Sequence, residues 1–555
     1  MTEHPQQYVL IHFGLNTITD REWGFGDEDP SLFCPDKFDA DAIARTVKEA
    51  GFQGIILVCK HHDGFCLWPT STTPYNITKS PWRNGKGDMV KEFSDAAARA
   101  GLKMGFYVSP WDRNHPAYGT PEYPAIFQQQ LREICTNYGT AFEIWFDGAN
   151  GGDGYYGGAR ENRAIDRVSY YQWEKTWQIV RDLQPGAAIF SDVGPDLRWV
   201  GNELGIAHPD SFGSITPEPP PEAPADHKAA PGYSNQFQLP GGSPEGAFYL
   251  PPECDVPLRP GWFYHPHEDG LQRTLPELLQ IYLSSVGAGG FWNLGIAPMP
   301  SGELNPGDIQ RLQEWGKTFR SLFEHCRFQQ TIAIRRGEWN SSPLEDAGQY
   351  NLLQFSEDLS CGERIRSYTF RFRRNGETVA EITGKAVGRN RLRLLPIICA
   401  DTLEYLVDGT GADDFLLTLA AYLAPEELFQ AEIKQKSILD RPDYRQIPAE
   451  KICRDSMQLT AYLPEETLIS GFVFVPYCNL QHGLPDHYSL EYRDSSGAWH
   501  LLRSGEFSNI AANPLPQIIL FDPICCREIR FRAEHLVAGH SFLFRECGIF
   551  PAKSE

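Results

Sequence analysis

Between residues 8 and 191 the chain alternates short apolar segments with amphipathic segments, and this alternation limits the possible folds more than any other feature. The apolar segments are typical of strands buried on both faces, and Gly51 and Gly101 end the helices that precede two of them. Strands that alternate with helices build a parallel sheet, because each helix returns the chain to the start of the next strand. The expected strands are 8–16, 54–60, 103–108, 141–146 and 187–191, and the expected helices are 39–50, 88–100, 123–138 and 169–183.

Polar residues stand at the ends of successive strands, as Ser109 and Asp147 do. This pattern favours a closed (β/α)8-like TIM barrel over an open doubly wound sheet. No Gly-x-Gly-x-x-Gly motif follows the first strand, which also disfavours a dinucleotide-binding fold. The proline- and glycine-rich stretch 205–260 is too long for an ordinary connection and is expected to be an insertion at the barrel rim that shapes a substrate pocket. A helix at 275–286, a strand at 290–294 and a helix at 308–326 are expected to close the barrel.

After about residue 330 the chain changes to short alternating segments that are typical of antiparallel β-sandwiches. Asn375-Gly376 joins two of them and is a strong hairpin signal. A similar set of segments recurs from about residue 440. We therefore predict a catalytic barrel at 1–330, a β-sandwich domain at 331–440 and a second, discoidin-like β-sandwich domain at 441–555.

The bulk properties restrict partners and compartment. The formal charge of −22 repels phosphate backbones, so we expect no nucleic-acid partner. Thirteen scattered cysteines, without zinc-type Cys-x-x-Cys pairs, indicate free thiols in a reducing compartment. The N-terminus does not resemble a signal peptide, and no apolar stretch has the length of a membrane span, so we expect a cytoplasmic protein that does not enter a membrane. The sequence indicates no cofactor and leaves the oligomeric state open.

The residues at the strand ends indicate a type of chemistry. Asp147 follows the apolar run 142–146 and is followed at once by glycines, which places a carboxylate at the rim of the sheet. Glu203 follows the fifth expected strand. Two acids at one barrel mouth fit glycoside hydrolysis, in which one carboxylate is the nucleophile and the other donates a proton to the leaving oxygen. Several histidines, and tryptophans such as Trp145, are available to bind sugar hydroxyls and to stack on sugar rings.

Alternatives remain open on these residues alone. His12, His61 or His62, and Asp147 could hold a metal ion in a metal-dependent barrel hydrolase, although adjacent His61 and His62 cannot both point inward from an ideal strand. Each residue also has a structural explanation, because Asp147 could cap the next segment and His12 and Trp145 could be core residues. A catalytically weak protein that binds glycans is a further alternative.

Six segments of the chain resemble the α-L-fucosidases of glycoside hydrolase family 29, as found in bacteria. The segments Lys-His-His-Asp-Gly-Phe at 60–65 and Glu-Ile-Trp-Phe-Asp-Gly at 143–148 are specific to this resemblance. The weaker ones are 11–14, 22–23, 105–109 and 198–203. The resemblance implies a retaining exo-glycosidase that needs no cofactor or metal and acts on fucosylated oligosaccharides, with Asp147 as nucleophile and Glu203 as general acid and base. Glu253 is a reserve candidate for the acid and base. The residues implied to bind substrate are His12, Glu22, Trp23, His61, His62, Tyr107, Trp145, Arg198, Arg259 and Trp262.

The segments 198–203 and 253–264 are most similar to the branch of the family that prefers α-1,3- and α-1,4-linked fucose on Lewis-type glycans. The long stretch 205–260 agrees with a site that also holds a neighbouring sugar. The segments 471–476, 504–509 and 548–550 resemble the discoidin-like sandwiches of that branch. The usual acidic loop is hard to find here, so a packing role is expected for these domains rather than glycan or calcium binding.

Overall fold

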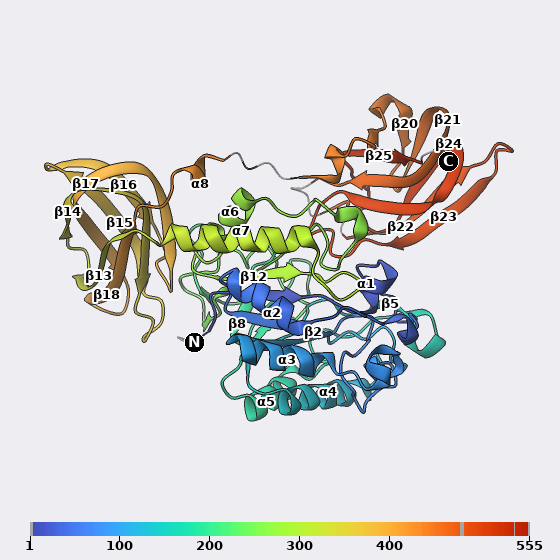
Figure 1. The fold of residues 1–555 in the computed structure, drawn as a ribbon, viewed down its shortest axis with the longest axis horizontal. Coiled ribbons are helices and arrows are strands. Elements are labelled where there is room, and N and C mark those ends of the chain that lie inside the picture. Colours follow the sequence, from blue (N-terminus) through green and yellow to red (C-terminus); the bar gives the residue numbers. More distant parts are fainter. Residues whose placement is uncertain (1–3, 432, 434–435, 478–481, 538, 553–555) are drawn as a thin grey trace. The chain divides into compact units, whose positions relative to one another are not determined.

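The computed structural model describes residues 4–431, 433, 436–477, 482–537 and 539–552, without the side chains of 345–347. The chain divides into two compact units, Met1–Lys434 and Gln435–Glu555. The first unit holds a barrel and an antiparallel sheet, and the second holds another antiparallel sheet (Figure 1).

A closed barrel of eight parallel strands forms the first part of the chain, with neighbours in the order β1-β12-β11-β8-β7-β4-β3-β2. The fold class that the sequence predicts, a (β/α)8-like TIM barrel followed by two β-sandwich domains, is confirmed. The barrel strands are β1 (Gln7–Ile11), β2 (Gly54–Lys60), β3 (Lys103–Val108), β4 (Ala141–Trp145), β7 (Ala188–Ser191), β8 (Leu197–Trp199), β11 (Pro252–Pro257) and β12 (Phe291–Ile296).

Helices wrap the outside of this barrel (Figure 1). Side-chain caps begin two of them, because Asp39 accepts a hydrogen bond from Ala42 N and Asp88 accepts one from Lys91 N. Gly101 ends the second of these with a φ of 64°, which favours glycine. The helices around the barrel are α2 (Ala40–Glu49), α3 (Met89–Ala100), α4 (Tyr123–Asn137), α5 (Trp173–Leu183), α6 (Leu275–Ser284) and α7 (Pro306–Leu322), and the short α1 (Leu15–Thr19) follows β1.

Alternate side chains of a barrel strand point to opposite faces, so the strands contribute to two apolar cores, one outside and one inside the barrel. On β1, Val9 and Ile11 pack in the layer between strands and helices, whereas Tyr8 and Leu10 belong to the smaller core within the barrel. Because the carboxyl ends of parallel strands meet at one rim, the residues that follow these strands gather there.

Two barrel strands differ from the sequence-based prediction. β8 is three residues long and lies in a segment for which the sequence predicts a loop. β11 lies inside 205–260, a stretch that the sequence predicts to be an insertion without a barrel strand. Proline at both ends of β11 hides this strand from pattern analysis, since proline is uncommon in strand interiors. Within residues 4–322, all of which the structure describes, no α-helix follows β7 or β8 before the next barrel strand.

The remaining insertion, residues 200–251, is irregular apart from a small antiparallel pair, β9 (Ser214–Ile215) and β10 (Phe248–Tyr249). A second small pair, β5 (Gly152–Gly154) and β6 (Glu161–Arg163), lies in the loop after β4. Both pairs lie in connections that follow the carboxyl end of a barrel strand, β8 for the first pair and β4 for the second.

The C-terminal half forms two antiparallel sheets with separate apolar cores. Asn375 and Gly376 both have positive φ in the turn between β15 and β16, as the Asn-Gly signal predicts. The predicted domain limits at 330 and 440 stay predictions, and the first of these sheets begins at Cys326. The first sheet contains β13 (Cys326–Arg335), β14 (Asn340–Glu357), β15 (Ile365–Arg374), β16 (Glu377–Gly384), β17 (Arg391–Gly409) and β18 (Asp414–Tyr422), and α8 (Glu427–Gln430) follows it. The second contains β19 (Arg445–Gln446), β20 (Ile452–Arg454), β21 (Gln458–Val475), β22 (Pro485–Arg493), β23 (Trp499–Glu506), β24 (Gln517–Leu536) and β25 (Glu546–Pro551).

The first of these sheets is hydrogen-bonded to the barrel insertion. Glu363 accepts hydrogen bonds from Gly213 N at 2.8 Å and Ser214 N at 3.3 Å, and Lys385 N donates to Asp210 Oδ1 at 2.9 Å. These contacts support the packing role expected for this domain.

Two further features bear on the expectations from composition. No helix in the described part of the chain is both long and apolar enough to cross a membrane. The cysteines within the described residues are all free, and several of them are buried.

Candidate active site

Asp147 stands directly beyond β4, at the carboxyl-end rim of the barrel. Tyr107 Oη donates to Asp147 Oδ2 at 2.8 Å, and Ala149 N donates to Oδ1 at 2.6 Å. Its side chain keeps 23% of its surface exposed in a surrounding where most side chains are buried. Burial raises the pKa of Asp147, and the hydrogen bonds from Ala149 and Tyr107 oppose that rise. The carboxylate is thus held in one orientation and still reachable from the rim.

His61 and His62 follow β2 and offer different ring atoms to the site. Asn16 Nδ2 donates to His61 Nδ1 at 3.3 Å, which leaves His61 Nε2 to carry the proton of the neutral ring. The hydroxyl of Ser109 donates to Trp111 O, so Ser109 Oγ accepts from His62 Nδ1 at 2.7 Å. His62 Nε2 is then an acceptor, and it lies 3.9 Å from Asp147 Oδ2.

Both histidines are neutral for the same reason. Burial, followed by neighbouring positive charges, holds the pKa of each ring well below its ordinary value. The pair therefore presents one N–H donor and one nitrogen acceptor side by side, with ring centroids 4.0 Å apart.

Glu203 reaches the site from the segment after β8. Trp262 Nε1 donates to Glu203 Oε2 at 3.0 Å. The ring of Trp262 lies 5.1 Å from the ring of His12, which lies 6.1 Å from that of Tyr107, the partner of Asp147. A continuous line of contacts thus joins the two acids across the barrel mouth.

His12 directly follows β1 and lies within this line of contacts. Its side chain is buried, and Nδ1 has no hydrogen-bond partner among the residues that the structure describes. Burial lowers the pKa of His12 to about 4, so the ring is neutral.

Glu22 and Trp23 lie in the loop after β1. Glu22 accepts hydrogen bonds from the backbone N–H groups of Trp262 and Phe263 and bonds to His265 Nε2 at 2.9 Å. Trp23 packs edge-on against His62 with centroids 5.1 Å apart. The loops after β1 and β11 are therefore joined at the rim.

Trp145 lies one layer below Asp147 in the barrel. It is stacked between Tyr107 and Phe190, with centroids 4.8 and 4.3 Å away. Its Nε1 donates to Glu253 Oε1 at 2.9 Å. Glu253 is 0% exposed and also accepts hydrogen bonds from Tyr8 and Asn293 in the barrel interior. That position sets the reserve candidate Glu253 apart from the rim where Glu203 lies.

Two of the predicted substrate-binding residues have other contacts. Arg198 is 0% exposed and donates to the carbonyls of residues 212, 213, 239 and 250, so it holds the backbone of the insertion. Arg259 is buried in an ion pair with Asp308 at 2.9 Å and also pairs with Asp269 at 3.0 Å. These two guanidinium groups are therefore engaged with the backbone of the insertion and with Asp269 and Asp308.

Pattern analysis missed four residues that support the site. Asn16 and Ser109 orient the two histidines, and His265 binds Glu22. Asp192, directly after β7, accepts hydrogen bonds from Gly232 N at 2.9 Å and Ser234 Oγ at 2.6 Å. Burial raises the pKa of Asp192 to about 6. Only the position of Ser109 and Asp192 at strand ends could have indicated them.

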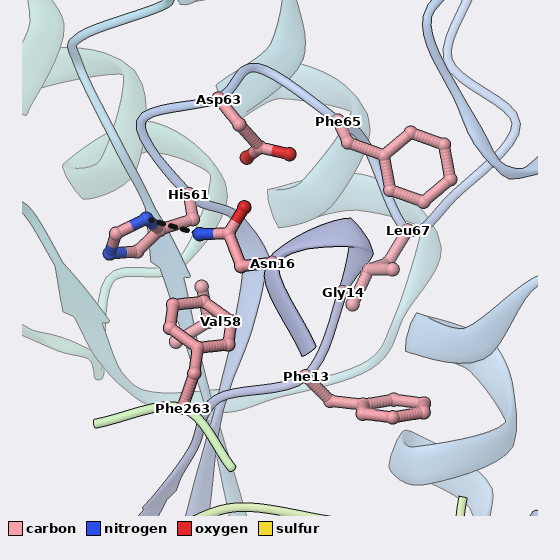
Figure 2. A pocket seen from close by; sticks show the side chains of 9 residues that line it. All are labelled: Phe13, Gly14, Asn16, Val58, His61, Asp63, Phe65, Leu67 and Phe263. Carbon is pink, nitrogen blue, oxygen red and sulfur yellow. Dashed lines mark hydrogen bonds between the residues drawn. The ribbon is translucent and has the colours of Figure 1, made fainter. Parts of the chain in front are cut away.

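A small cavity adjoins His61 on the side of the loops after β1 and β2 (Figure 2). Asn16 points across it toward His61, and Asp63 faces it from the other side. Burial raises the pKa of Asp63 well above its ordinary value. The lining is Phe13, Gly14, Asn16, Val58, His61, Asp63, Phe65, Leu67 and Phe263, and this set contains neither Asp147 nor Glu203.

The donor atoms of His12, His61, His62 and Asp147 are not gathered as a metal site requires. Among the described residues, two groups of three bring possible metal ligands within 4.8 Å of one another, Asp20 with His265 and His267, and Asp486 with His487 and His535. Neither group includes the four residues of the metal-hydrolase alternative, so the side-chain geometry does not favour it.

Comparison with known proteins shows the family to which the chain belongs. The family model described as Alpha-L-fucosidase matches residues 5–204. Alpha-L-fucosidase 1 of Arabidopsis thaliana is 34% identical over 450 residues, which cover 75% of this chain and 84% of the plant protein. A glycoside hydrolase 29 family member from an unknown rumen bacterium has a TM-score of 0.71 at 34% identity and covers 99% of this chain and 97% of its own. A family 29 fucosidase from Ruminococcus gnavus, solved in complex with fucose, has a TM-score of 0.64 at 26% identity and covers 76% of this chain and 93% of its own. The chain is an enzyme that belongs to the α-L-fucosidases of glycoside hydrolase family 29.

Proposed function

We propose that this enzyme is a retaining exo-α-L-fucosidase that releases terminal α-1,3- and α-1,4-linked L-fucose from Lewis-type oligosaccharides and glycoconjugates. The observation that carries the proposal is the fixed, partly exposed carboxylate of Asp147 at the barrel rim, with Glu203 joined to it by the contacts of Trp262, His12 and Tyr107.

In the first step Asp147 attacks the anomeric carbon of the fucose and forms a covalent glycosyl-enzyme, while Glu203 gives its proton to the glycosidic oxygen that leaves. In the second step Glu203 takes a proton from water, whose oxygen attacks the anomeric carbon and frees Asp147. Two inversions return the original configuration. The hydrogen bonds from Tyr107 and Ala149 support the nucleophile role, because they favour the ionised carboxylate and fix its direction.

The proposed fucose site is lined by groups suited to sugar hydroxyls. His61 offers an N–H donor and His62 an acceptor nitrogen, so adjacent hydroxyls can be bound with opposite polarity. Nδ1 of His12 is a buried polar atom that a hydroxyl would satisfy. Trp23 supplies apolar surface for the methyl group and ring of fucose, and Trp145, stacked between Tyr107 and Phe190, can present only its edge.

The preference for branched acceptors rests on the insertion. Asp192 binds Gly232 and Ser234 of the insertion and interacts electrostatically with Asp147, which brings this segment to the nucleophile's side of the rim. A segment at that position can contact the sugar beyond the fucose. The proposal therefore includes a second sugar subsite built by residues 200–251.

The test of the chemistry is Asp147→Ala with an aryl fucoside and a Lewis trisaccharide as substrates. We expect loss of fucose release by about 10³-fold or more with an unchanged melting temperature. Azide should restore turnover of Asp147→Gly and give a product of inverted configuration. Wild-type rates in Asp147→Ala would refute the nucleophile assignment, and binding without turnover by the wild-type protein would support the glycan-binding alternative instead.

The test of the linkage preference is a panel of fucosylated oligosaccharides compared with the aryl fucoside. We expect higher kcat/KM on α-1,3- and α-1,4-linked, branched substrates than on the aryl fucoside or on α-1,2-linked fucose. Equal rates across the panel would contradict the assignment to this branch of the family. Unchanged activity after treatment with a chelator would count against the metal-hydrolase alternative.

A further inference from the structure

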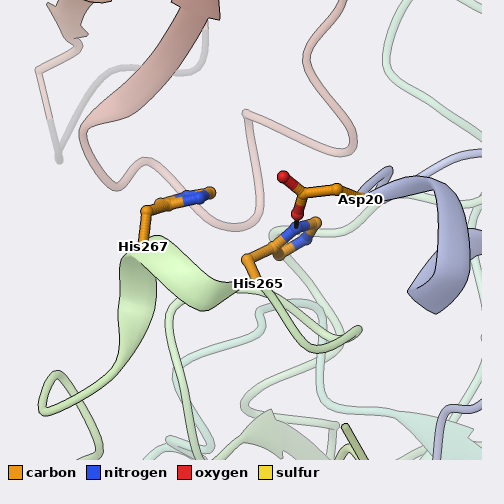
Figure 3. Close-up of side chains that lie close together, drawn as sticks. All are labelled: Asp20, His265 and His267. Atoms are coloured by element: carbon orange, nitrogen blue, oxygen red, sulfur yellow. Dashed lines mark hydrogen bonds and ion pairs between the residues drawn. The ribbon is translucent and has the colours of Figure 1, made fainter. Parts of the chain in front are cut away.

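His265 lies between two carboxylates of the loop after β1, and one of them belongs to the proposed fucose site. His265 Nδ1 is 2.7 Å from Asp20 Oδ1, and Nε2 is 2.9 Å from Glu22 Oε2. Figure 3 shows the Asp20 carboxylate directed at the ring, with His267 on the neighbouring turn. An ionised carboxylate only accepts hydrogen bonds, so a ring that bonds to one at each nitrogen carries both protons. The geometry is that of a buried imidazolium, with 9% of the side chain exposed.

The charges around this ring agree with that state. It faces Asp20 and Glu22 on the loop after β1, and His267 and Glu268 on its own side. Burial works against the charge, but the hydrogen bonds to Asp20 and Glu22 and the charge of Glu268 hold the pKa of His265 well above its ordinary value. Burial raises the pKa of Glu268 to about 7, and Arg259 is the other cation near that carboxyl.

The positive charge of His265 stabilises the ionised form of Glu22. Burial alone would raise its pKa, but the hydrogen bond and charge of His265 and two backbone N–H groups keep the pKa of Glu22 below its ordinary value. Those N–H groups belong to Trp262 and Phe263, so the same carboxylate fixes the start of the segment that carries Trp262.

Gly261, Glu22 and His265 are packed so closely that even a methyl group on Gly261 would collide with its neighbours. A Cβ on Gly261 would lie 2.9 Å from Glu22 Oε2 and 3.0 Å from His265 Cδ2. The next residue, Trp262, donates to Glu203 Oε2. A displacement of Glu22 would therefore pass to Trp262 and from there to Glu203.

We propose that His265 is a positioning residue, which as a cation keeps Glu22 anionic and ties the loop after β11 to the loop after β1, so that Trp262 holds Glu203 in place. This inference rests on the proposed function, because Glu22 and Glu203 are the substrate-binding and acid/base groups named there. A metal ion held by Asp20, His265 and His267 is the competing explanation of the same cluster. It would need the lone pair of one ring nitrogen of His265, and both ring nitrogens bond to carboxylates here.

The test compares His265→Gln and His265→Ala with the matched control His267→Gln in the full chain. Glutamine can still donate one hydrogen bond to Glu22 but carries no charge. We expect both His265 variants to move the acidic limb of the kcat/KM profile to higher pH, because Glu22 loses its cation and its pKa rises. Each unit of that shift lowers kcat/KM about tenfold on the acidic side. The rise in KM should exceed the fall in kcat, and His267→Gln should keep the wild-type profile. A wild-type acidic limb in His265→Gln would overturn the inference.

A second measurement needs no turnover. In the full chain with isotope-labelled histidine, the ring signals that vanish in His265→Gln should remain those of an imidazolium well above the ordinary titration midpoint of histidine, and Glu22→Gln should lower the midpoint of His265. Titration near the ordinary value of about 6.5 would overturn the inference. If the wild-type protein holds one equivalent of tightly bound metal and His267→Gln loses it, the cluster is a metal site and the inference is wrong. A wild-type protein that releases no fucose while His265 stays charged would refute the proposed function instead, so the two failures are distinguishable.

Discussion

At the scale of single residues, the site depends on how each acid is held rather than on the acids alone. Asp147 and Glu253 are both carboxylates that follow or lie in barrel strands, yet only Asp147 keeps exposed surface at the rim. Asp147 is fixed by Tyr107 and Ala149, and Glu253 is enclosed by Tyr8, Trp145 and Asn293. The same functional group therefore has a proposed catalytic role in one place and a structural role in the other.

Tyr107→Phe tests the contact that holds Asp147. The variant keeps the stacking on Trp145 and removes the hydroxyl that favours ionised Asp147, so the raised pKa of Asp147 rises further. We expect the acidic limb of kcat/KM to move to higher pH, since a hydrogen bond to a charged group contributes about 1.5–3 kcal/mol. The control Tyr138→Phe removes a hydroxyl that bonds to Asp88 on the outer surface of the barrel and should leave the profile unchanged. An unshifted limb in Tyr107→Phe would show that this hydroxyl does not set the ionisation of Asp147.

At the scale of elements, the insertion between β8 and β11 is built onto the barrel by a few buried polar side chains. Arg198 on β8 binds the carbonyls of residues 212, 213, 239 and 250 of the insertion, and Asp192 after β7 binds Gly232 and Ser234. An irregular segment of this length needs such partners, because its backbone groups are not paired within a helix or sheet. The conformation of the insertion is therefore a property of the barrel strands beneath it.

Arg198→Met tests this dependence. The variant leaves buried carbonyls without their donor, at a cost of about 1–3 kcal/mol for each that stays unsatisfied. We expect a lower melting temperature, faster proteolysis within residues 200–251, and a larger loss of kcat/KM on branched oligosaccharides than on an aryl fucoside. Arg167→Met is the matched control, because Arg167 also binds a carbonyl of the insertion, that of Gly232, but from an exposed position. Equal proteolysis of the two variants would contradict the anchoring role of Arg198.

At the scale of the whole molecule, the barrel interior contains a cluster of acids that links stability to pH. Glu143, Glu253 and Asp255 lie together with Tyr8 and Asn293, and His4 bonds to Glu143. Burial, and then the charge of Glu253, raises the pKa of Glu143 and of Asp255 well above their ordinary values. Burial lowers the pKa of His4 to about 3, so the 2.9 Å contact between His4 and Glu143 joins two neutral groups.

Glu143→Gln tests this linkage. A raised folded-state pKa contributes stability that is complete below the unfolded pKa of about 4.5 and is lost as pH rises through the folded pKa, at up to about 1.4 kcal/mol per pH unit. Glutamine can still donate to His4 but does not titrate, so the variant should gain on the wild type as pH increases from 5 to 9. Calorimetric melting temperatures across this range measure the difference. The control Glu49→Gln, at an exposed position, should show no pH-dependent difference in melting temperature from the wild type. If the difference in melting temperature between Glu143→Gln and the wild type does not change with pH, Glu143 is ionised in the folded protein.

The division into two units leads to a prediction about independent folding. Residues 4–431 contain the barrel, the insertion and the sheet that binds the insertion, and their apolar cores are separate from that of residues 436–552. We expect a chain that ends after residue 431 to fold and to release fucose from an aryl fucoside with kcat/KM within about threefold of the full chain, because no proposed site residue is removed. Circular dichroism and fucose release measure this. An insoluble or inactive fragment would show that the second unit is required for folding or catalysis.

The sequence by itself determined the barrel, the antiparallel sheets and the position of Asp147 at the barrel rim. Periodicity and glycine positions are local signals, and a carboxylate after a buried strand of a barrel must lie at its rim, so Asp147 and the five early strands could be predicted. It could not reveal β8 and β11, because one is very short and the other begins and ends with proline.

Only the tertiary structure decided which polar residues meet. Arg198 and Arg259 match the site by sequence, but their guanidinium groups are bound elsewhere. His265 carries no sequence signal and Asp192 only its position after a strand, yet both contact the site. The physical reason is that hydrogen-bond partners far apart in the chain are set by the closure of the barrel and by its loops. Glu22 and His265, 243 residues apart, become partners only when β1 and β11 take their places in one closed sheet.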